Sequence, residues 1–254
     1  MTEPPPGTDW LPYGLVLVVA CALVLVVLAV RSRHRVTSLP DREGYFADWA
    51  TVHGGYEPRG LVAWWLRGIF LLARPLAGFG VSPAVLTAGG AVTAGLVPCL
   101  AVVGPRWPVL AGFVVAVSAC LDSLDGAVAV LSARTTAWGF LVDSLVDRFA
   151  DIALLAALWL LGAAGWLVVV AGAALGLLEY ARARAGNAGM SEVGVVTVGE
   201  RPTRIIIASS FLITAGIFCS VAGDVAAIAA AATAAVSLIG LLQLLAAAGS
   251  TLDR

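Results

Sequence analysis

Seven apolar stretches, each about 20 residues long, are the feature that most restricts how this chain can fold. A helix of roughly 20 apolar residues crosses the hydrocarbon core of a bilayer. The stretches are continuous apolar blocks and lack the alternating pattern of membrane β-barrel strands. They predict an all-α, polytopic membrane helix bundle with seven spans, at residues 13–30, 83–103, 107–131, 138–162, 165–182, 204–222 and 225–247.

The composition of the chain excludes several other classes of protein. Apolar residues make up 60% of the 254 residues and charged residues only 12%, and the mean hydropathy is +0.97. These values exclude a disordered chain and an ordinary soluble enzyme. Nucleic-acid binders carry a basic surface, so the net charge of −1 predicts no nucleic-acid partner.

Arginine placement predicts how the bundle is oriented. Most arginines lie in segments that an odd number of spans places on one side, and only Arg106 lies in a loop on the other side. Positive residues favour the cytoplasmic side of a membrane. We therefore expect a multi-pass protein of the cell membrane with its N-terminus outside, its C-terminus inside and membrane lipids around it.

The first half of the chain divides into segments of different character. Residues 1–35 read as an uncleaved transmembrane anchor, because the positive charges follow the apolar run instead of preceding it. Residues 36–60 read as a cytoplasmic connector. Residues 61–80 mix Trp64 and Trp65 with Arg67 and Arg74, a pattern typical of a helix lying in the headgroup plane. Residues 81–254 hold the other six spans.

Four aspartates in two neighbouring spans indicate chemistry inside the membrane. Each aspartate at the centre of a membrane helix costs roughly 2.5–3.5 kcal/mol, and packing gains nothing from them. Asp122 and Asp125 are three residues apart, and Asp143 and Asp147 are four apart, so each pair shares one helix face. The short connection makes the two helices antiparallel neighbours. Hard divalent cations prefer oxygen ligands, so we expect one or two Mg²⁺ or Mn²⁺ ions here.

The stretch DSLDGAVAVLSARTTAWGFLVDSLVD resembles the signature of the CDP-alcohol phosphatidyltransferases, D-x2-D-G-x2-A-R-x8-G-x3-D-x3-D. One position differs, because Val130 stands where the family has arginine. The resemblance implies a six-helix catalytic core preceded by an interfacial helix, with the first apolar span as an addition. The matching positions are Asp122, Asp125, Gly126, Ala129, Gly139, Asp143 and Asp147.

The resemblance also implies an activity, a homodimer and a set of site residues. A phosphatidyl group would pass from CDP-diacylglycerol, or another CDP-alcohol, to an alcohol acceptor, and CMP would leave. Asp147 would be the general base for the acceptor hydroxyl. The metal ligands would be Asp122, Asp125, Asp143 and Asp147, and the CDP-donor contacts would be Asp122, Asp125, Gly126, Ala129 and Gly139.

Four arginines near the inner ends of the fifth and sixth spans suggest what the acceptor is. Guanidinium groups suit a ligand that carries phosphate, such as inositol phosphate or glycerol phosphate. The surrounding E-R-P-x-R run resembles the phosphatidylinositol phosphate synthase branch of the family. The alternative is plain positive-inside anchoring. The arginines are Arg182, Arg184, Arg201 and Arg204.

Two other functions stay open from the sequence. A divalent-cation or proton-coupled transporter would also carry aspartates inside the membrane, although the spans at 83–103, 204–222 and 225–247 contain no acidic residue. A catalytically silent relative that binds a CDP-lipid would explain Val130 at the arginine position.

Overall fold

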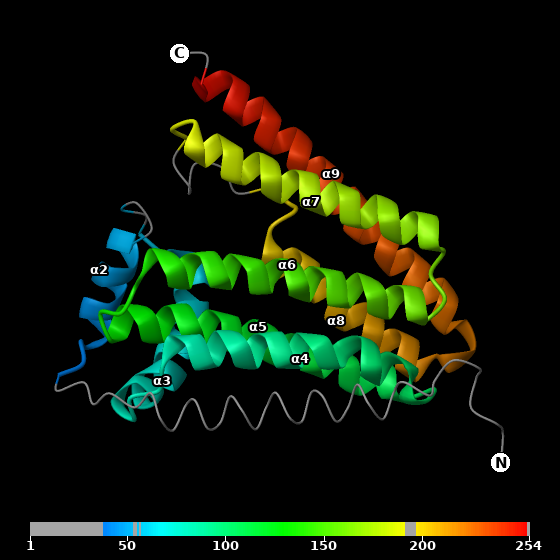
Figure 1. The fold of residues 1–254 in the computed structure, drawn as a ribbon, viewed down its shortest axis with the longest axis horizontal. Coiled ribbons are helices and arrows are strands. Elements are labelled where there is room, and N and C mark those ends of the chain that lie inside the picture. The colour runs from blue at the N-terminus through cyan, green and yellow to red at the C-terminus, as the bar shows by residue number, and fades with distance from the viewer. Residues whose placement is uncertain (1–37, 53–54, 56, 191–196, 253–254) are drawn as a thin grey trace.

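The computed structural model describes residues 38–52, 55, 57–190 and 197–252. The predicted first span, 13–30, lies outside these residues. Within them all regular structure is helical. Figure 1 shows α4 to α9 running lengthwise beside one another. The helices are α2 (Arg42–Val52), α3 (Gly60–Gly78), α4 (Pro83–Val103), α5 (Trp107–Leu131), α6 (Ala137–Leu160), α7 (Gly165–Asn187), α8 (Arg201–Ile217) and α9 (Ala222–Leu252), with a 3-10 turn η1 (Cys219–Val221) before α9.

The all-helical bundle confirms the predicted fold class, and six helices coincide with the six predicted spans that the structure describes. Local signals set several boundaries. Proline occupies the first turn of α4, α5 and α8, where its missing N–H costs nothing. The Thr136 side chain caps α6 by accepting a hydrogen bond from the Gly139 N–H at 3.0 Å. Gly162, at φ 113°, allows the tight turn that follows α6.

Within the part of the chain that the structure describes, four helical segments are long and apolar enough to cross a membrane, and they confirm an integral membrane protein. They are Pro83–Val103, Trp107–Leu131, Gly165–Asn187 and Cys219–Leu252. The helix α6 is less apolar because Asp143, Asp147, Arg148 and Asp151 lie along it. The helix α8 is shorter, at 17 residues. Of the helices at predicted spans, α6 and α8 are therefore the two that do not meet this criterion. Both carry charged residues of the site described below.

Close contact between α5 and α8 determines where α8 begins relative to α5. A Cβ atom added at Gly112 would lie 2.7 Å from Ile213 Cγ1, and one at Gly216 would lie 2.5 Å from the Val109 nitrogen. Ser209 Oγ donates a hydrogen bond to the Gly112 carbonyl at 2.9 Å. Because the start of α5 contacts the end of α8, the two helices run antiparallel. Since a side chain would not fit at Gly112 or Gly216, these contacts also fix the register between the two helices. The first turn of α8 then lies beside the second half of α5.

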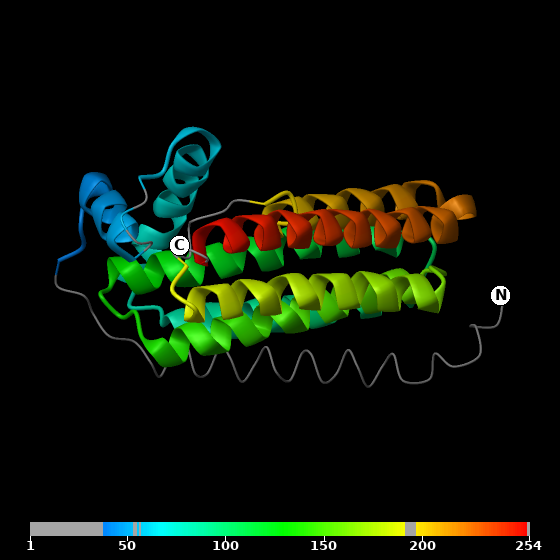
Figure 2. The same ribbon diagram turned by 90° about the horizontal axis from the view of Figure 1, so that it is seen from above.

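The two helices before the core lie across one end of the bundle, as Figure 2 shows. The predicted interfacial segment 61–80 is indeed a helix, α3. Its residue Trp64 is 67% exposed while Ile69 is 2% exposed, so it has one buried and one open face. The helix α2 was not predicted, because we read 36–60 only as a connector. Its residue Tyr45 is fully buried, and burial raises the pKa of the Tyr45 hydroxyl to about 12.

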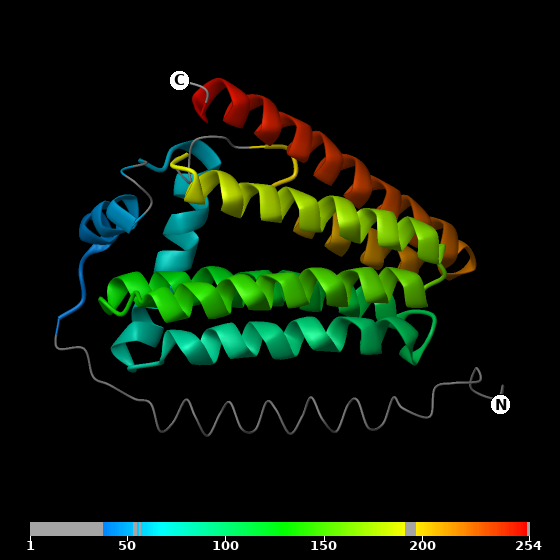
Figure 3. The same ribbon diagram turned by 45° about the horizontal axis from the view of Figure 1, so that its top comes forward.

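The residue at the family's arginine position belongs to this packing. Val130 is 9% exposed and lies in an apolar cluster with Tyr45, Phe70 and Leu131. It therefore helps to attach α2 and α3 to the end of α5. In Figure 3, α7 and α9 form a layer on one side of α6, and α4 lies on the other side.

Candidate active site

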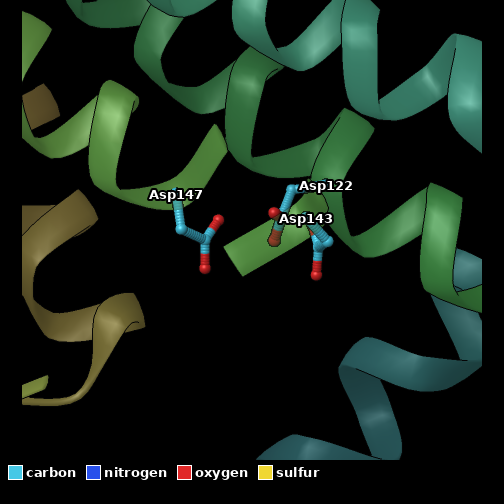
Figure 4. Close-up of side chains that lie close together, drawn as sticks. All are labelled: Asp122, Asp143 and Asp147. Carbon is cyan, nitrogen blue, oxygen red and sulfur yellow. The ribbon is translucent and has the colours of Figure 1, made fainter. Parts of the chain in front are cut away.

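Three carboxylates from two helices lie together between α5 and α6. Asp122 extends from α5, and Asp143 and Asp147 extend from successive turns of α6 (Figure 4). One oxygen atom from each residue lies within 4.8 Å of one from the others. The predicted clustering of the two helix faces is therefore observed for three of the four aspartates.

The fourth aspartate, Asp125, is held separately. It is 5% exposed, and its Oδ2 accepts a hydrogen bond of 2.6 Å from Thr87 Oγ1 of α4. Asp125 is not in the group of three whose oxygens converge. A hydrogen bond from α4 thus fixes the orientation of this carboxylate one turn away from Asp122.

The acidic group has the properties of a site for a divalent cation. Asp143 Oδ1 is buried and has no hydrogen-bond partner among the described residues, which is costly unless a ligand compensates. When ionised, the three carboxylates carry three negative charges, and the guanidinium groups of Arg201 and, at 4.0 Å from Asp147, Arg148 lie beside them. Oxygen donors with that charge fit Mg²⁺ or Mn²⁺.

Arg201 joins the acidic group from a third helix. It stands in the first turn of α8, and its Nη1 contacts Asp122 Oδ2 and Asp147 Oδ1. Its side chain is 21% exposed. One of the arginines predicted to bind the acceptor thus lies directly against the predicted general base.

The two glycines of the motif leave open space beside the acidic group. Gly126 is exposed, and a Cβ atom added there would meet no atom within 4 Å. A Cβ atom at Gly139 would meet only Thr136 Oγ1, at 3.1 Å. Helix packing within the described chain therefore does not explain either glycine, whereas a bulky ligand near the backbone would.

The other three predicted acceptor arginines differ in their surroundings. Arg182 Nη2 donates to Glu200 Oε1 at 2.7 Å and to Thr197 Oγ1 at 3.3 Å. Arg204 is only 2% exposed and is ion-paired with Glu179 and Asp151. Arg184 is exposed and forms no ion pair with the residues that the structure describes.

Sequence reasoning missed one residue of the site, Glu179. It lies on α7 inside a stretch that we read as an apolar span, and its carboxylate meets Arg148, Arg182 and Arg204. A glutamate within a membrane span carries the same transfer cost as the aspartates. That cost was the available signal, but Glu179 stands outside the motif.

The family model that matches this chain covers the aspartate motif at residues 122–147. The model of the CDP-alcohol phosphatidyltransferase family matches residues 80–244. An archaetidylinositol phosphate synthase of Pyrococcus horikoshii is 34% identical over 106 residues, which are 41% of this chain and 56% of that protein. One from Methanothermobacter thermautotrophicus is 39% identical over 93 residues, 36% of this chain and 47% of that protein. The chain spans about half the length of these curated relatives.

Solved structures show the same arrangement of helices. The Mycobacterium tuberculosis phosphatidylinositol phosphate synthase PgsA1, in complex with manganese and citrate, has a TM-score of 0.57 at 24% identity. That match covers 72% of this chain and 89% of PgsA1. The same enzyme with CDP-DAG bound has a TM-score of 0.55 at 25% identity, covering 72% of this chain and 94% of that chain.

Proposed function

Because the chain belongs to the CDP-alcohol phosphatidyltransferase family, we propose that it transfers a phosphatidyl group from CDP-diacylglycerol, or a related CDP-alcohol, to a phosphorylated alcohol. The observation that carries this proposal is the group of Asp122, Asp143 and Asp147 with Arg201 against it. It combines ligands for a divalent cation with a cationic group beside a carboxylate that can accept a proton.

The metal ligands in this proposal are Asp122, Asp143 and Asp147, together with Asp125, which Thr87 orients. A bound Mg²⁺ or Mn²⁺ would neutralise the diphosphate and stabilise the leaving CMP. The open space at Gly126 and Gly139 suits the nucleotide part of the donor. Ala129, which lies on α5 with Gly126, is also proposed to contact the donor. The PgsA1 structures with manganese and with CDP-DAG support both assignments.

Asp147 is proposed as the general base. It would take the proton from the acceptor hydroxyl, whose oxygen then forms a bond to the phosphorus nearer the lipid while the bond from that phosphorus to the CMP oxygen breaks. The guanidinium of Arg201 contacts the carboxylate of Asp147. A carboxylate accepts a proton in its ionised form, and Arg201 provides a neighbouring positive charge.

The acceptor is proposed to be a phosphorylated alcohol of the inositol phosphate class. Arg201 and Arg182 are partly exposed and would meet the phosphate first, with exposed Arg184 and the buried Arg204 contributing positive charge. The relatives named as archaetidylinositol phosphate and phosphatidylinositol phosphate synthases support this class.

The proposal extends to the setting of the enzyme. It includes a homodimer, as the family resemblance implies, and the cell membrane as location. It also includes the orientation expected from the arginines, with the N-terminus outside and the active site facing the cytoplasm.

Release of CMP tests the proposed function. Purified protein in detergent receives CDP-diacylglycerol, Mg²⁺ or Mn²⁺ and a panel of free and phosphorylated alcohols. We expect CMP and a new phospholipid only with metal, and fastest with a phosphorylated alcohol. Metal-dependent uptake into vesicles without CMP would instead favour the transporter, and donor binding without turnover would favour the silent relative.

A further inference from the structure

One carboxylate connects arginines from three helices behind the proposed acceptor site. Glu179 Oε1 accepts a hydrogen bond of 2.8 Å from Arg204 Nη1 of α8. The same oxygen lies 3.5 Å from Arg148 Nη1 of α6. Glu179 Oε2 lies 4.0 Å from Arg182 Nε of α7. Glu179 is therefore the point at which the charged groups of α6, α7 and α8 meet.

Arg204 depends on Glu179 for its charge balance and its orientation. The Arg204 side chain is 2% exposed, and its Nη1 is shared between Glu179 and the Gly199 carbonyl at 2.6 Å. Its Nε and Nη2 are buried without a hydrogen-bond partner in the described part of the chain. A buried guanidinium needs a paired charge, and Glu179 provides the nearest one.

The contact with Glu179 determines which edge of the Arg204 guanidinium faces away from Glu179. Because Nη1 is occupied, the other edge consists of Nε and of Nη2, which lies 3.7 Å from Asp151 Oδ2 without a hydrogen bond. An arginine edge of this kind can bind two oxygens at once. Arg204 lines a cavity of about 40 Å³ together with Arg201 and Asp151. Arg204 also follows Arg201 by three residues, which places both on the same face of α8.

Arg148 connects the Glu179 carboxylate to α6, the helix that carries Asp143 and Asp147. It follows Asp147 directly in α6 and is ion-paired with Asp151 at 3.1 Å. Without the charge of Glu179, Arg148 and Arg204 would have only Asp151 and Asp147 as neighbouring counter-charges in the described structure. The orientations of Arg148 and Arg204 would then depend mainly on the one carboxylate of Asp151, which both of them contact.

We propose that Glu179 is a positioning residue that orients Arg204 and Arg148, and so determines how tightly the enzyme binds a phosphorylated acceptor. This inference rests on the proposed function. It predicts that the charge of Glu179 affects the acceptor and not the donor, whose proposed contacts lie on α5 and α6.

The test is the variant Glu179→Gln, which keeps the shape of the side chain and removes its charge. We expect the acceptor KM to rise about tenfold, as for the loss of one hydrogen bond between charged groups. The donor KM and kcat should stay within about twofold. The matched control is Glu57→Gln, because Glu57 is exposed and, among the described residues, is ion-paired only with Arg59 at 3.3 Å. It should leave all three constants unchanged.

A double-mutant cycle separates positioning from a general structural effect. In an Arg204→Gln background, Glu179→Gln should raise the acceptor KM by less than about twofold further, because Arg204, its nearest arginine partner at 2.8 Å, is already gone. If Glu179→Gln does not fold, Glu179→Asp takes its place, since it keeps the charge but is one methylene shorter. It should then produce a smaller increase in the same constant.

The outcomes distinguish this inference from the function on which it rests. If the unaltered enzyme uses a phosphorylated acceptor but Glu179→Gln leaves its KM unchanged, or changes only kcat, the positioning role is wrong. An equal effect with and without Arg204 would also overturn it. If the unaltered enzyme releases no CMP with any phosphorylated alcohol, the proposed function itself is wrong.

Discussion

The guanidinium of Arg201, in the first turn of α8, contacts the carboxylates of both Asp122 on α5 and Asp147 on α6. This relationship connects two groups of residues that are separate in the sequence, the aspartates proposed as metal ligands and the arginines proposed to bind the acceptor. In the proposed function, Arg201 would therefore bring the acceptor's phosphate close to Asp147, the proposed base for its hydroxyl.

Replacing Asp147 with asparagine should lower kcat at least about 100-fold, because a positioned general base contributes that much or more. The substitution keeps the size of the side chain, so donor binding should persist. CMP release and binding of CDP-diacylglycerol are measured side by side. Asp224→Asn, at an exposed residue in the first turn of α9, is the control, and appreciable turnover by Asp147→Asn would remove Asp147 as the base.

Replacing Arg201 with alanine should raise the acceptor KM about tenfold or more and the donor KM much less. The physical reason is the loss of a charge-assisted contact with the acceptor's phosphate. Steady-state kinetics with each substrate varied in turn provide the comparison. Arg106→Ala, in the loop before α5, is the control, and equal effects of Arg201→Ala on both substrates would contradict the acceptor role.

Replacing Arg204 with alanine should destabilise the protein by about 3–5 kcal/mol, the cost of leaving one partner of a buried ion pair unpaired. Arg204 is 2% exposed and pairs with Glu179, whereas Arg184 is exposed. Thermal unfolding in detergent should therefore show a large decrease for Arg204→Ala and almost none for Arg184→Ala. Similar melting temperatures for the two variants would mean that Arg204 is not buried as described.

Replacing Gly126 with alanine should change stability and activity in opposite directions. Alanine favours a helix by roughly 1 kcal/mol over glycine, and the added Cβ would meet no atom within 4 Å. The donor KM should nevertheless rise, because the methyl group occupies space assigned to the nucleotide. Gly68→Ala in α3 is a matched control that also meets open space, and it should stabilise the helix without altering the donor KM.

Removing divalent cations with EDTA should abolish CMP release, and Mg²⁺ or Mn²⁺ should restore it. Asp143→Asn should weaken Mn²⁺ binding about tenfold or more, since it removes one of three converging carboxylates and metal affinity depends on ligand charge. Electron paramagnetic resonance of free Mn²⁺ measures this directly and needs no turnover. Unchanged Mn²⁺ affinity in Asp143→Asn would place the metal elsewhere.

Particular residues show how far the sequence could predict this structure. The helix bounds of α4 and α5 agree with the predicted spans to the residue, because apolar length and the prolines in their first turns are local signals. The pairs Asp122–Asp125 and Asp143–Asp147 were predicted to share helix faces for the same reason. The convergence of three of these residues followed from the short connection between α5 and α6.

Other features depend on contacts between residues far apart in the chain. The helix α2 has little amphipathic pattern in its sequence, REGYFADWATV, and it is stabilised by burial of Tyr45 against Phe70. Nothing in the sequence around Val130 indicates that this side chain packs with α2 and α3 instead of facing a substrate. Glu179 could be noted as costly in a membrane helix, but its three arginine partners lie on different helices.

Local patterns in the sequence predict the helices α4 to α9, the membrane around them and the two acidic helix faces, since hydropathy and helical periodicity act over a few residues. Packing between helices is needed to place Asp125 against Thr87 and Arg201 against Asp122 and Asp147. It also places Glu179 against Arg148, Arg182 and Arg204. These relationships depend on the register between helices. Backbone contacts such as those at Gly112 and Gly216 set that register, and no local pattern in the chain encodes which helices meet there.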